Sequence, residues 1–159
     1  MTALIPMTEA EYSHYVLEAV PSFAAEKATS GEWTQEEALN LSRKAFQKLL
    51  PRGLNTPDLY LYTVQDGAGN PVGVLWMAAI KRGDQRIAYV YEIGIKPEHR
   101  RKGFAKGALL RLEGIAREMG LSGIALHVFG HNKQAQALYS GLGYQPTNIK
   151  LFKPLRGGG

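Results

Sequence analysis

The chain passes from a strand to a helix within the stretch YVYEIGIKPEHRRKGFAK, residues 89–106. Tyr89 to Ile95 is rich in β-branched and aromatic side chains, which favours a strand. From Ala105 to Met119 apolar residues recur at helical spacing. Between the two lies a basic turn with a glycine, Arg100 to Ala105. Because a helix N-terminus has free N–H groups and partial positive charge, this turn predicts a binding site for a phosphate compound.

The length of 159 residues suits one domain, which we expect over residues 1–155 with a flexible tail at 156–159. Hydrophobic residues make up 45% of the chain and charged residues 21%, as in ordinary globular proteins. With no long apolar run and no secretory signal, we expect a cytoplasmic protein with no membrane partner. The absence of cysteine excludes disulfides, thiolate metal sites and a cysteine nucleophile.

The net charge is +5, and its concentrated part is the stretch from Lys96 to Lys106. A local basic patch fits a small polyanion as well as it fits nucleic acid. No array of aromatic residues for base stacking accompanies it, so we expect no nucleic-acid partner. The histidines lack metal-ligand spacing, and we expect no metal site.

The remaining elements follow from capping signals and periodicity. Capping boxes at Thr8–Glu11 and Thr34–Glu37 begin two helices. The first runs toward Lys27, with Pro21 expected to break or kink it. A short helix is predicted over residues 132–142. Strands are predicted over residues 4–7, 59–64, 72–80, 89–95, 124–129 and 148–153.

The strand, helix and strand between Tyr89 and Phe129 form a βαβ unit, whose two strands should be parallel. With the basic turn inside this unit, the chain resembles the GNAT family of acyl-CoA-dependent N-acetyltransferases. The family's signature is Arg or Gln, two residues, Gly, one residue, then Gly or Ala, and Arg100, Gly103 and Ala105 match it. Further residues that resemble the family are Pro97, Glu98, Asn132, Ala135, Leu138, Tyr139, Leu142, Gly143 and Tyr144.

The resemblance implies an α/β fold with a mixed, mostly antiparallel twisted sheet and helices on both faces. A V-shaped opening between the parallel strands that end at Ile95 and Phe129 should receive acetyl-CoA as co-substrate. The implied reaction is transfer of acetyl to a primary amine of a small molecule or peptide, by direct attack in a ternary complex. The missing cysteine agrees with the absence of a covalent acyl-enzyme. A non-catalytic acyl-CoA-binding or sensing module is the alternative. Pairing through Ile149 to Phe152 would give a homodimer.

The pyrophosphate of acyl-CoA needs converging N–H donors, which the backbone from Arg101 to Lys106 supplies. By resemblance, the pantetheine arm pairs with the strand near Ile95, where Gly94 fits a bulge or a close approach. Asn132 is assigned a cofactor contact in the same way. The expected cofactor-binding residues are Ile93, Gly94, Ile95, Arg100, Arg101, Lys102, Gly103, Phe104, Ala105, Lys106, Asn132 and Tyr139.

The resemblance makes Tyr139 the general acid that protonates the leaving thiolate. The acceptor ammonium, with a reference pKa of about 10.4, must lose a proton before it attacks. Two candidate bases are Glu92, a carboxylate in an otherwise apolar strand, and His127, since histidine is the side chain most often used as a general base. The sequence does not choose between them, and a joint action through water stays open. Each residue also has a structural alternative. His127 could be a core histidine that is hydrogen-bonded to the backbone, and Glu92 could pair with a lysine or arginine across the sheet.

The acceptor side is expected between Tyr12 and Leu61, from the first two helices and the loops around the hairpin. Nothing in the pattern selects the amine. The aromatic candidates for its lining are Tyr15, Phe23, Trp33, Tyr60 and Tyr62.

Overall fold

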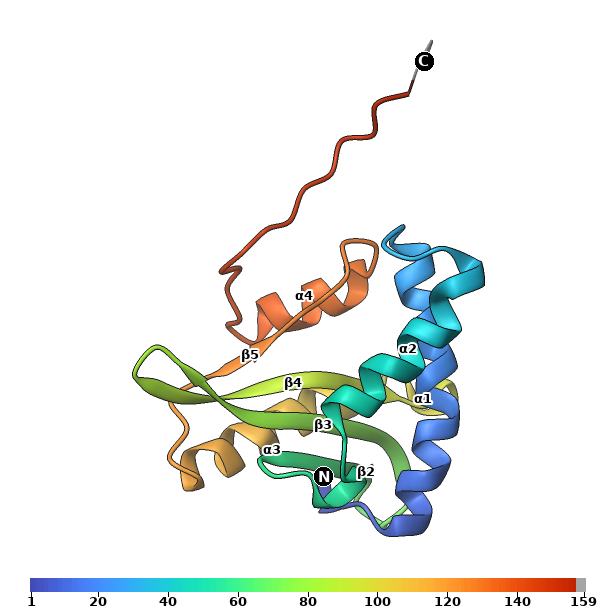
Figure 1. Cartoon of the computed structure of the whole chain (residues 1–159). Helices are drawn as coiled ribbons and strands as arrows, with labels where there is room; N and C mark the ends of the chain where they lie inside the picture. The colour runs from blue at the N-terminus through green and yellow to red at the C-terminus, as the bar shows by residue number, and fades with distance from the viewer. Residues whose placement is uncertain (157–159) are drawn as a thin grey trace.

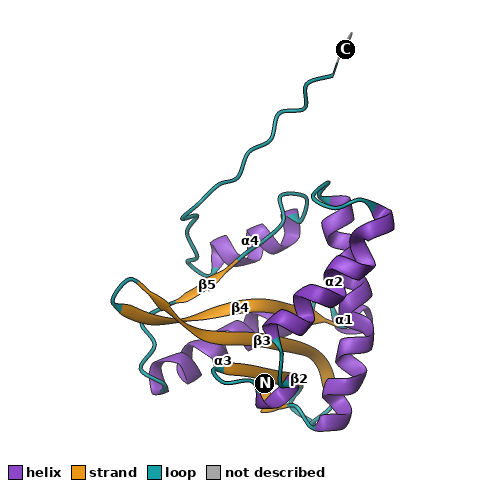
Figure 2. Cartoon of the chain, in the orientation of Figure 1, coloured by secondary structure: helices purple, strands orange, loops and turns teal. Residues whose placement is uncertain are grey.

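The computed structural model describes residues 1–156 and contains a five-stranded sheet covered by helices (Figures 1 and 2). Every neighbouring pair of strands is antiparallel except β4 and β5, which are parallel. The mixed, mostly antiparallel sheet predicted from the sequence is thus confirmed. In sheet order the strands are β1 (Ala3–Pro6), β2 (Leu59–Gln65), β3 (Pro71–Arg82), β4 (Gln85–Ile95) and β5 (Ile124–Leu126).

Helices cover both faces of the sheet, as predicted. On one face α3 packs its apolar stripe, which includes Ala108 and Leu112, against Leu75 and Met77 of β3. On the other face α1 places Tyr15 with Trp76 in a second core cluster. Burial of each large apolar side chain contributes about 1.5–3 kcal/mol. The helical elements are α1 (Glu9–Thr29), α2 (Gln35–Leu49), η1 (Gly53–Asn55), η2 (Pro97–His99), α3 (Phe104–Glu118) and α4 (Lys133–Gly141).

The first two helices begin where the sequence places them. Thr8 and Thr34 each accept a hydrogen bond from the backbone of the glutamate three residues later, which completes both predicted capping boxes. Of the two effects expected at Pro21, a break or a kink, the break is wrong, because α1 continues through Pro21 to Thr29. The proline removes one N–H donor, and the buried side chains of α1 offset that loss. The fully buried Ser42 also ties α2 to α1, by donating to the Val20 carbonyl at 2.7 Å.

Two predicted strands differ from the structure. β5 ends at Leu126 instead of Phe129, and residues 148–153 do not form a strand. A strand needs a neighbour for its N–H and C=O groups, and none lies beside residues 148–153 in the described chain. Residues 145–156, here termed the C-terminal arm, instead run away from the body of the protein (Figure 1). Of the expected tail, residues 157–159 lie outside the described residues.

β3 and β4 approach closely at Gly73, a position that the sequence did not single out. A Cβ atom there would overlap the carbonyl oxygen of Gly94 and meet the Ile95 side chain at 2.8 Å. A side chain at Gly73 would therefore push β4 away at the strand end where the site lies.

We predict that Gly73→Ala lowers the free energy of unfolding by about 1–3 kcal/mol, the usual cost of overpacking. The matched control is Gly114→Ala, because Gly114 is exposed on α3 with open space around it. There the same substitution should raise the free energy by about 0.5–1 kcal/mol through helix propensity. Urea unfolding measures both variants, and equal effects would contradict the close approach of the two strands.

Candidate active site

The parallel pairing of β4 and β5 covers three residue pairs, the last of which is Val90 with Leu126. β4 continues to Ile95, while the chain after Leu126 leaves the sheet. From Tyr91 onward, one edge of β4 therefore has no neighbouring strand within residues 1–156. This is the opening that the sequence predicted between the two parallel strands.

A β-bulge lies at Tyr91 on β4. Trp76 of β3 pairs with Glu92 and the next residue, Met77, pairs with Val90, so Tyr91 is an extra residue. Neighbouring strand residues normally point to opposite faces, but a bulge shifts this alternation. As a result Tyr91 and Glu92 both line the same cavity, whereas Val90, which also borders that cavity, packs into the core cluster beneath α3.

The bulge therefore occurs at Tyr91 and not at Gly94, which pairs regularly with Val74. A Cβ atom at Gly94 would have Glu92 Oε2 and Val74 Cγ2 at 3.9 Å as its nearest neighbours. The backbone at Gly94 is consequently open to a close approach, which was the other role expected for it.

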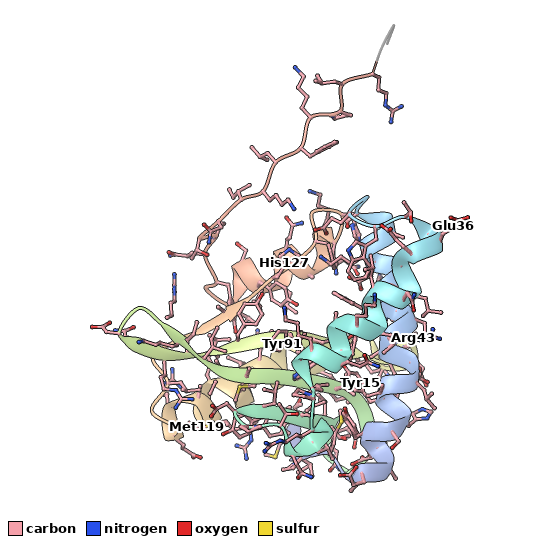
Figure 3. All side chains as sticks on the ribbon, in the orientation of Figure 1. Tyr15, Glu36, Arg43, Tyr91, Met119 and His127 are labelled. Carbon is pink, nitrogen blue, oxygen red and sulfur yellow. The ribbon has the colours of Figure 1, made fainter. Side chains whose placement is uncertain are left out.

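A cavity of about 440 Å³ lies between the open part of β4 and helices α1, α2 and α4. Its lining brings together the three predicted catalytic residues, Glu92, His127 and Tyr139, with Asn132. Figure 3 shows three sides of this region, with Tyr15 on α1, Tyr91 on the sheet and His127 beyond β5. The cavity thus combines groups from distant parts of the sequence.

Glu92 lies inside the cavity and accepts a hydrogen bond from the buried hydroxyl of Tyr15 on α1. Burial raises the pKa of Glu92 above its usual value, and the negative charge of Glu26 adds to this rise. The hydrogen bond from Tyr15 acts in the opposite direction. A carboxyl group with a raised pKa in a cavity has the properties of a general base.

His127 stands just after β5 and is exposed at the cavity. Its ring meets the edge of the Phe129 ring, with the two centroids 5.0 Å apart. The sequence placed His127 within a strand, and the early end of β5 moves it into a loop.

Tyr139 and Asn132 line the cavity from α4, which agrees with their spacing on one helix face. Burial raises the pKa of Tyr139, and the charge of Glu26 raises it further. The phenol is therefore protonated at neutral pH, and its O–H is able to donate a hydrogen bond to a ligand. Asn132 caps α4, since its Oδ1 accepts from the Ala135 N–H at 3.2 Å. Its amide N–H₂ group can still serve a ligand.

The basic turn lies beyond the cavity, at the C-terminal end of β4, and is largely exposed. Gly103 precedes α3 with a φ of 82°, and no side chain caps the helix. The first hydrogen bond of the helix runs from the Gly107 N–H to the Gly103 carbonyl, which leaves the first-turn amides available to an anion.

A side-chain contact and an unusual backbone angle fix the shape of the basic turn. Arg100 Nε donates to the Ile95 carbonyl at 2.9 Å, which ties the turn to the end of β4. Arg101 has a φ of 63°, in the region that favours glycine. The turn therefore has a defined shape at the point where α3 begins.

The aromatic residues expected to line the acceptor side lie on different faces of the sheet. Tyr15 and Phe23 line the cavity, but Tyr60 and Tyr62 belong to the core on the other face. Trp33 packs edge-on against Phe23, with centroids 5.6 Å apart. The lining residues that the sequence analysis did not single out as site residues are Ala19, Ser22, Glu26, Lys27, Ala45, Phe46, Leu49, Trp76, Tyr89, Val90, Tyr91, Val128 and Phe129.

A signal for part of that missed lining exists in the sequence. Tyr15, Ala19, Ser22 and Glu26 recur at three- and four-residue spacing, which places them on one face of α1. Within this stripe Glu26 is exposed, and it is the member with a carboxyl group that lines the cavity.

No group of three His, Cys, Asp or Glu side chains in residues 1–156 is arranged to hold a metal ion. Over the same residues, no helix has the length and apolar character required to cross a membrane.

Comparison with known proteins places this geometry in a family. The uncharacterized N-acetyltransferases YycN and YdgE of Bacillus subtilis are 39% and 38% identical to the chain. Their matches cover 96% and 94% of this chain and 97% and 95% of theirs. The crystal structure of YycN superposes with a TM-score of 0.94 at 38% identity, covering 98% of this chain and 99% of that one.

A more distant structure has the same fold. The aminoglycoside antibiotic 6'-N-acetyltransferase of Acinetobacter baumannii superposes with a TM-score of 0.59 at 16% identity, covering 99% of this chain and all of that one. The acetyltransferase (GNAT) family model matches residues 23–144. The chain therefore belongs to the GNAT family of acetyltransferases.

Proposed function

We propose that the protein transfers an acetyl group from acetyl-CoA to a primary amine, with both substrates bound at once. The observation that carries this proposal is the cavity itself. It holds a carboxyl group with a raised pKa, Glu92, and a protonated phenol, Tyr139, beside an unpaired strand edge. One group accepts a proton and the other donates a hydrogen bond, as amine attack on a thioester requires.

For the donor substrate, the first-turn amides of α3 and the exposed basic side chains suit a pyrophosphate. The unpaired edge of β4 from Ile93 to Ile95 offers backbone groups to the amides of the pantetheine arm. Gly94 leaves this edge uncrowded. These features support acetyl-CoA as the donor.

For the proton acceptor we choose Glu92 over His127. Glu92 is held by Tyr15 inside the cavity, and its raised pKa brings it closer to the pH at which it must work. His127 is exposed and lies on a loop, so its position is less fixed. The ammonium proton passes to Glu92 directly or through one water, and the neutral amine then attacks the thioester carbonyl.

For the leaving group we assign Tyr139. The breaking carbon–sulfur bond places negative charge on sulfur, which the phenol stabilises by donating a hydrogen bond. Because burial raises the pKa of Tyr139, full proton transfer to a thiolate is uphill, and hydrogen bonding provides most of the effect.

For the acceptor, the lining favours a cationic amine with an apolar body. Phe46, Trp76 and Tyr91 form an aromatic wall, in which the Trp76 and Tyr91 centroids are 4.8 Å apart. The carboxyl groups of Glu26 and Glu92 face the same space. Lys27 also lines the cavity, with its ammonium 5.9 Å from the centroid of the Phe129 ring, but its charge is offset by the ion pair with Glu32 at 3.3 Å.

The proposal is tested with a panel of primary amines and an assay of free CoA release. We predict turnover with at least one amine and a loss of kcat of about 10²–10⁴-fold in Glu92→Gln, as expected when a general base is removed. Glutamine keeps the size of the side chain and an acceptor for Tyr15. Glu36→Gln, on the exposed start of α2, is the matched control and should keep full activity.

Two results would contradict this. Full turnover by Glu92→Gln would remove Glu92 from the reaction. Binding of acetyl-CoA without acetylation of any amine in the panel would support the acyl-CoA-sensing module instead.

The hydrogen bond from Tyr15 gives a pH prediction. It lowers the pKa of Glu92, so Tyr15→Phe should raise that pKa. The ionised base then forms at higher pH, and the acid limb of the kcat/KM profile should move toward higher pH. Tyr12→Phe, also on α1 and without a contact to Glu92, is the control and should leave the limb in place. A limb that moves toward lower pH would contradict the assignment.

The turn gives a binding prediction. Gly103→Ala should weaken acetyl-CoA binding about tenfold, equivalent to about 1.4 kcal/mol, because a methyl group crowds the first-turn amides. Gly120→Ala is matched to it, since Gly103 and Gly120 have φ values of 82° and 75° and open surroundings. Both variants should lose similar stability, about 1–2 kcal/mol. Calorimetric titration checks the difference in affinity, and equal affinities would exclude the turn from the donor site.

A further inference from the structure

The ammonium group of Lys27, near the end of α1, lies among three aromatic rings. Its Nζ is 5.7 Å from the centroid of Phe23, 5.5 Å from that of Trp33 and 5.9 Å from that of Phe129. Glu32 pairs with the same ammonium at 3.3 Å. A cation is attracted by the negative face of an aromatic ring. Lys27 thus joins contacts from α1, from the turn after α1 and from the loop that follows β5.

The turn after α1 returns the chain to Lys27. Gly31 has a φ of 81°, in the region that favours glycine. The next two backbone N–H groups, of Glu32 and Trp33, then donate to the Lys27 carbonyl at 3.1 and 3.4 Å. The carboxyl group and the indole ring around Lys27 therefore come from the adjoining stretch of chain. The contact with Phe129 is different, because it connects α1 to a distant part of the sequence.

Phe129 is in turn bound to the start of α4. Its carbonyl oxygen accepts from the Asn132 N–H at 3.0 Å and from Gln136 Nε2 at 3.2 Å. Its ring meets the His127 ring edge-on and stacks on the His131 ring, with the latter two centroids 5.4 Å apart. Because ring and carbonyl belong to one residue, a displacement of Phe129 from α1 would also displace the first turn of α4.

The position of α4 matters because this helix brings Tyr139 to the cavity. Every residue of α4 is exposed or half-buried, and the strand before it, β5, pairs over three residues. A helix with so little buried surface depends on contacts at its ends for a fixed position. Figure 1 shows the loop between β5 and α4 beside the turn that joins α1 to α2, where Lys27 meets Phe129.

We propose that Lys27 is a positioning residue, which holds Phe129 against α1 and so keeps Tyr139 of α4 in place in the cavity that Glu92 lines. This role rests on the proposed function, in which Tyr139 stabilises the leaving sulfur. The ammonium of Lys27 is engaged by Glu32 and by the rings, so its effect on the reaction passes through α4. Loss of the cation should therefore lower kcat by misplacing Tyr139.

The first test requires no turnover and measures amide hydrogen exchange in the full chain. Lys27→Met keeps the apolar stem of the side chain and removes the ammonium. Exchange at the backbone amides of α4 should become about tenfold faster, while exchange in α3 on the other face of the sheet stays the same. Lys27→Arg keeps a cation over the rings and should preserve slow exchange in α4. Lys44→Met, at an exposed lysine on α2, is the matched control. Unchanged exchange of α4 in Lys27→Met would overturn the proposal.

The second test asks whether Lys27 acts through Tyr139. Lys27→Met should lower kcat about tenfold, and Lys27→Arg should retain most of the activity. In a Tyr139→Phe background the same Lys27→Met change should cost less than about twofold, because the group that it positions is already gone. Equal losses in the two backgrounds would reject the positioning role and leave the proposed function intact. A wild type that acetylates no amine would remove the proposed function, and the exchange result would still decide whether Lys27 holds α4.

Discussion

The parallel ladder between β4 and β5 stops after three residue pairs, and the candidate active site depends on that early end. β4 continues from Tyr91 to Ile95 with β3 on one side and an open edge on the other. Backbone N–H and C=O groups on such an edge need partners, and the amides of the proposed donor substrate would supply them. The residues that follow β5, His127 to Phe129, line the cavity instead of extending the ladder.

The bulge at Tyr91 determines what faces this cavity. Without it Glu92 would point toward the core beneath α3, where an ionised carboxylate is costly. With it Glu92 reaches Tyr15, and two opposing effects act on its pKa. Burial makes the carboxyl harder to ionise, while the phenol stabilises the ionised form. As a result the carboxyl group of Glu92 is partly shielded from water and also hydrogen-bonded.

Local features of this fold could be read from the sequence because they depend on neighbouring residues. The capping boxes at Thr8 and Thr34 and the glycine turn at Gly103 are of this kind, and so is the shared helix face of Asn132 and Tyr139. The bulge at Tyr91 could not be read, because it is a property of the register between two strands.

The last predicted strand also depended on a neighbour that the sequence does not reveal. Residues 148–153 have a strand pattern, but a strand forms where a neighbour exists, and a single chain offers none in the described structure. The lining from Phe46 and Trp76 depends on how α2 and β3 meet across the cavity. Spacing in the sequence predicts which residues share a face of one helix or strand. The proposed acceptor side is formed by several helices and strands, so spacing alone does not predict it.

Glu26 links acceptor binding to the chemistry. Its negative charge raises the pKa of both Glu92 and Tyr139, so without a cation beside it Glu92 is harder to ionise and Tyr139 is a weaker acid. A cationic amine beside Glu26 would compensate that charge and lower both pKa values together. Glu92 would then ionise more readily and Tyr139 would become a better donor while the acceptor is present. In the proposed ternary complex a larger fraction of Glu92 would be ionised and ready to accept a proton, although with a lower proton affinity, and Tyr139 would stabilise the leaving sulfur more strongly.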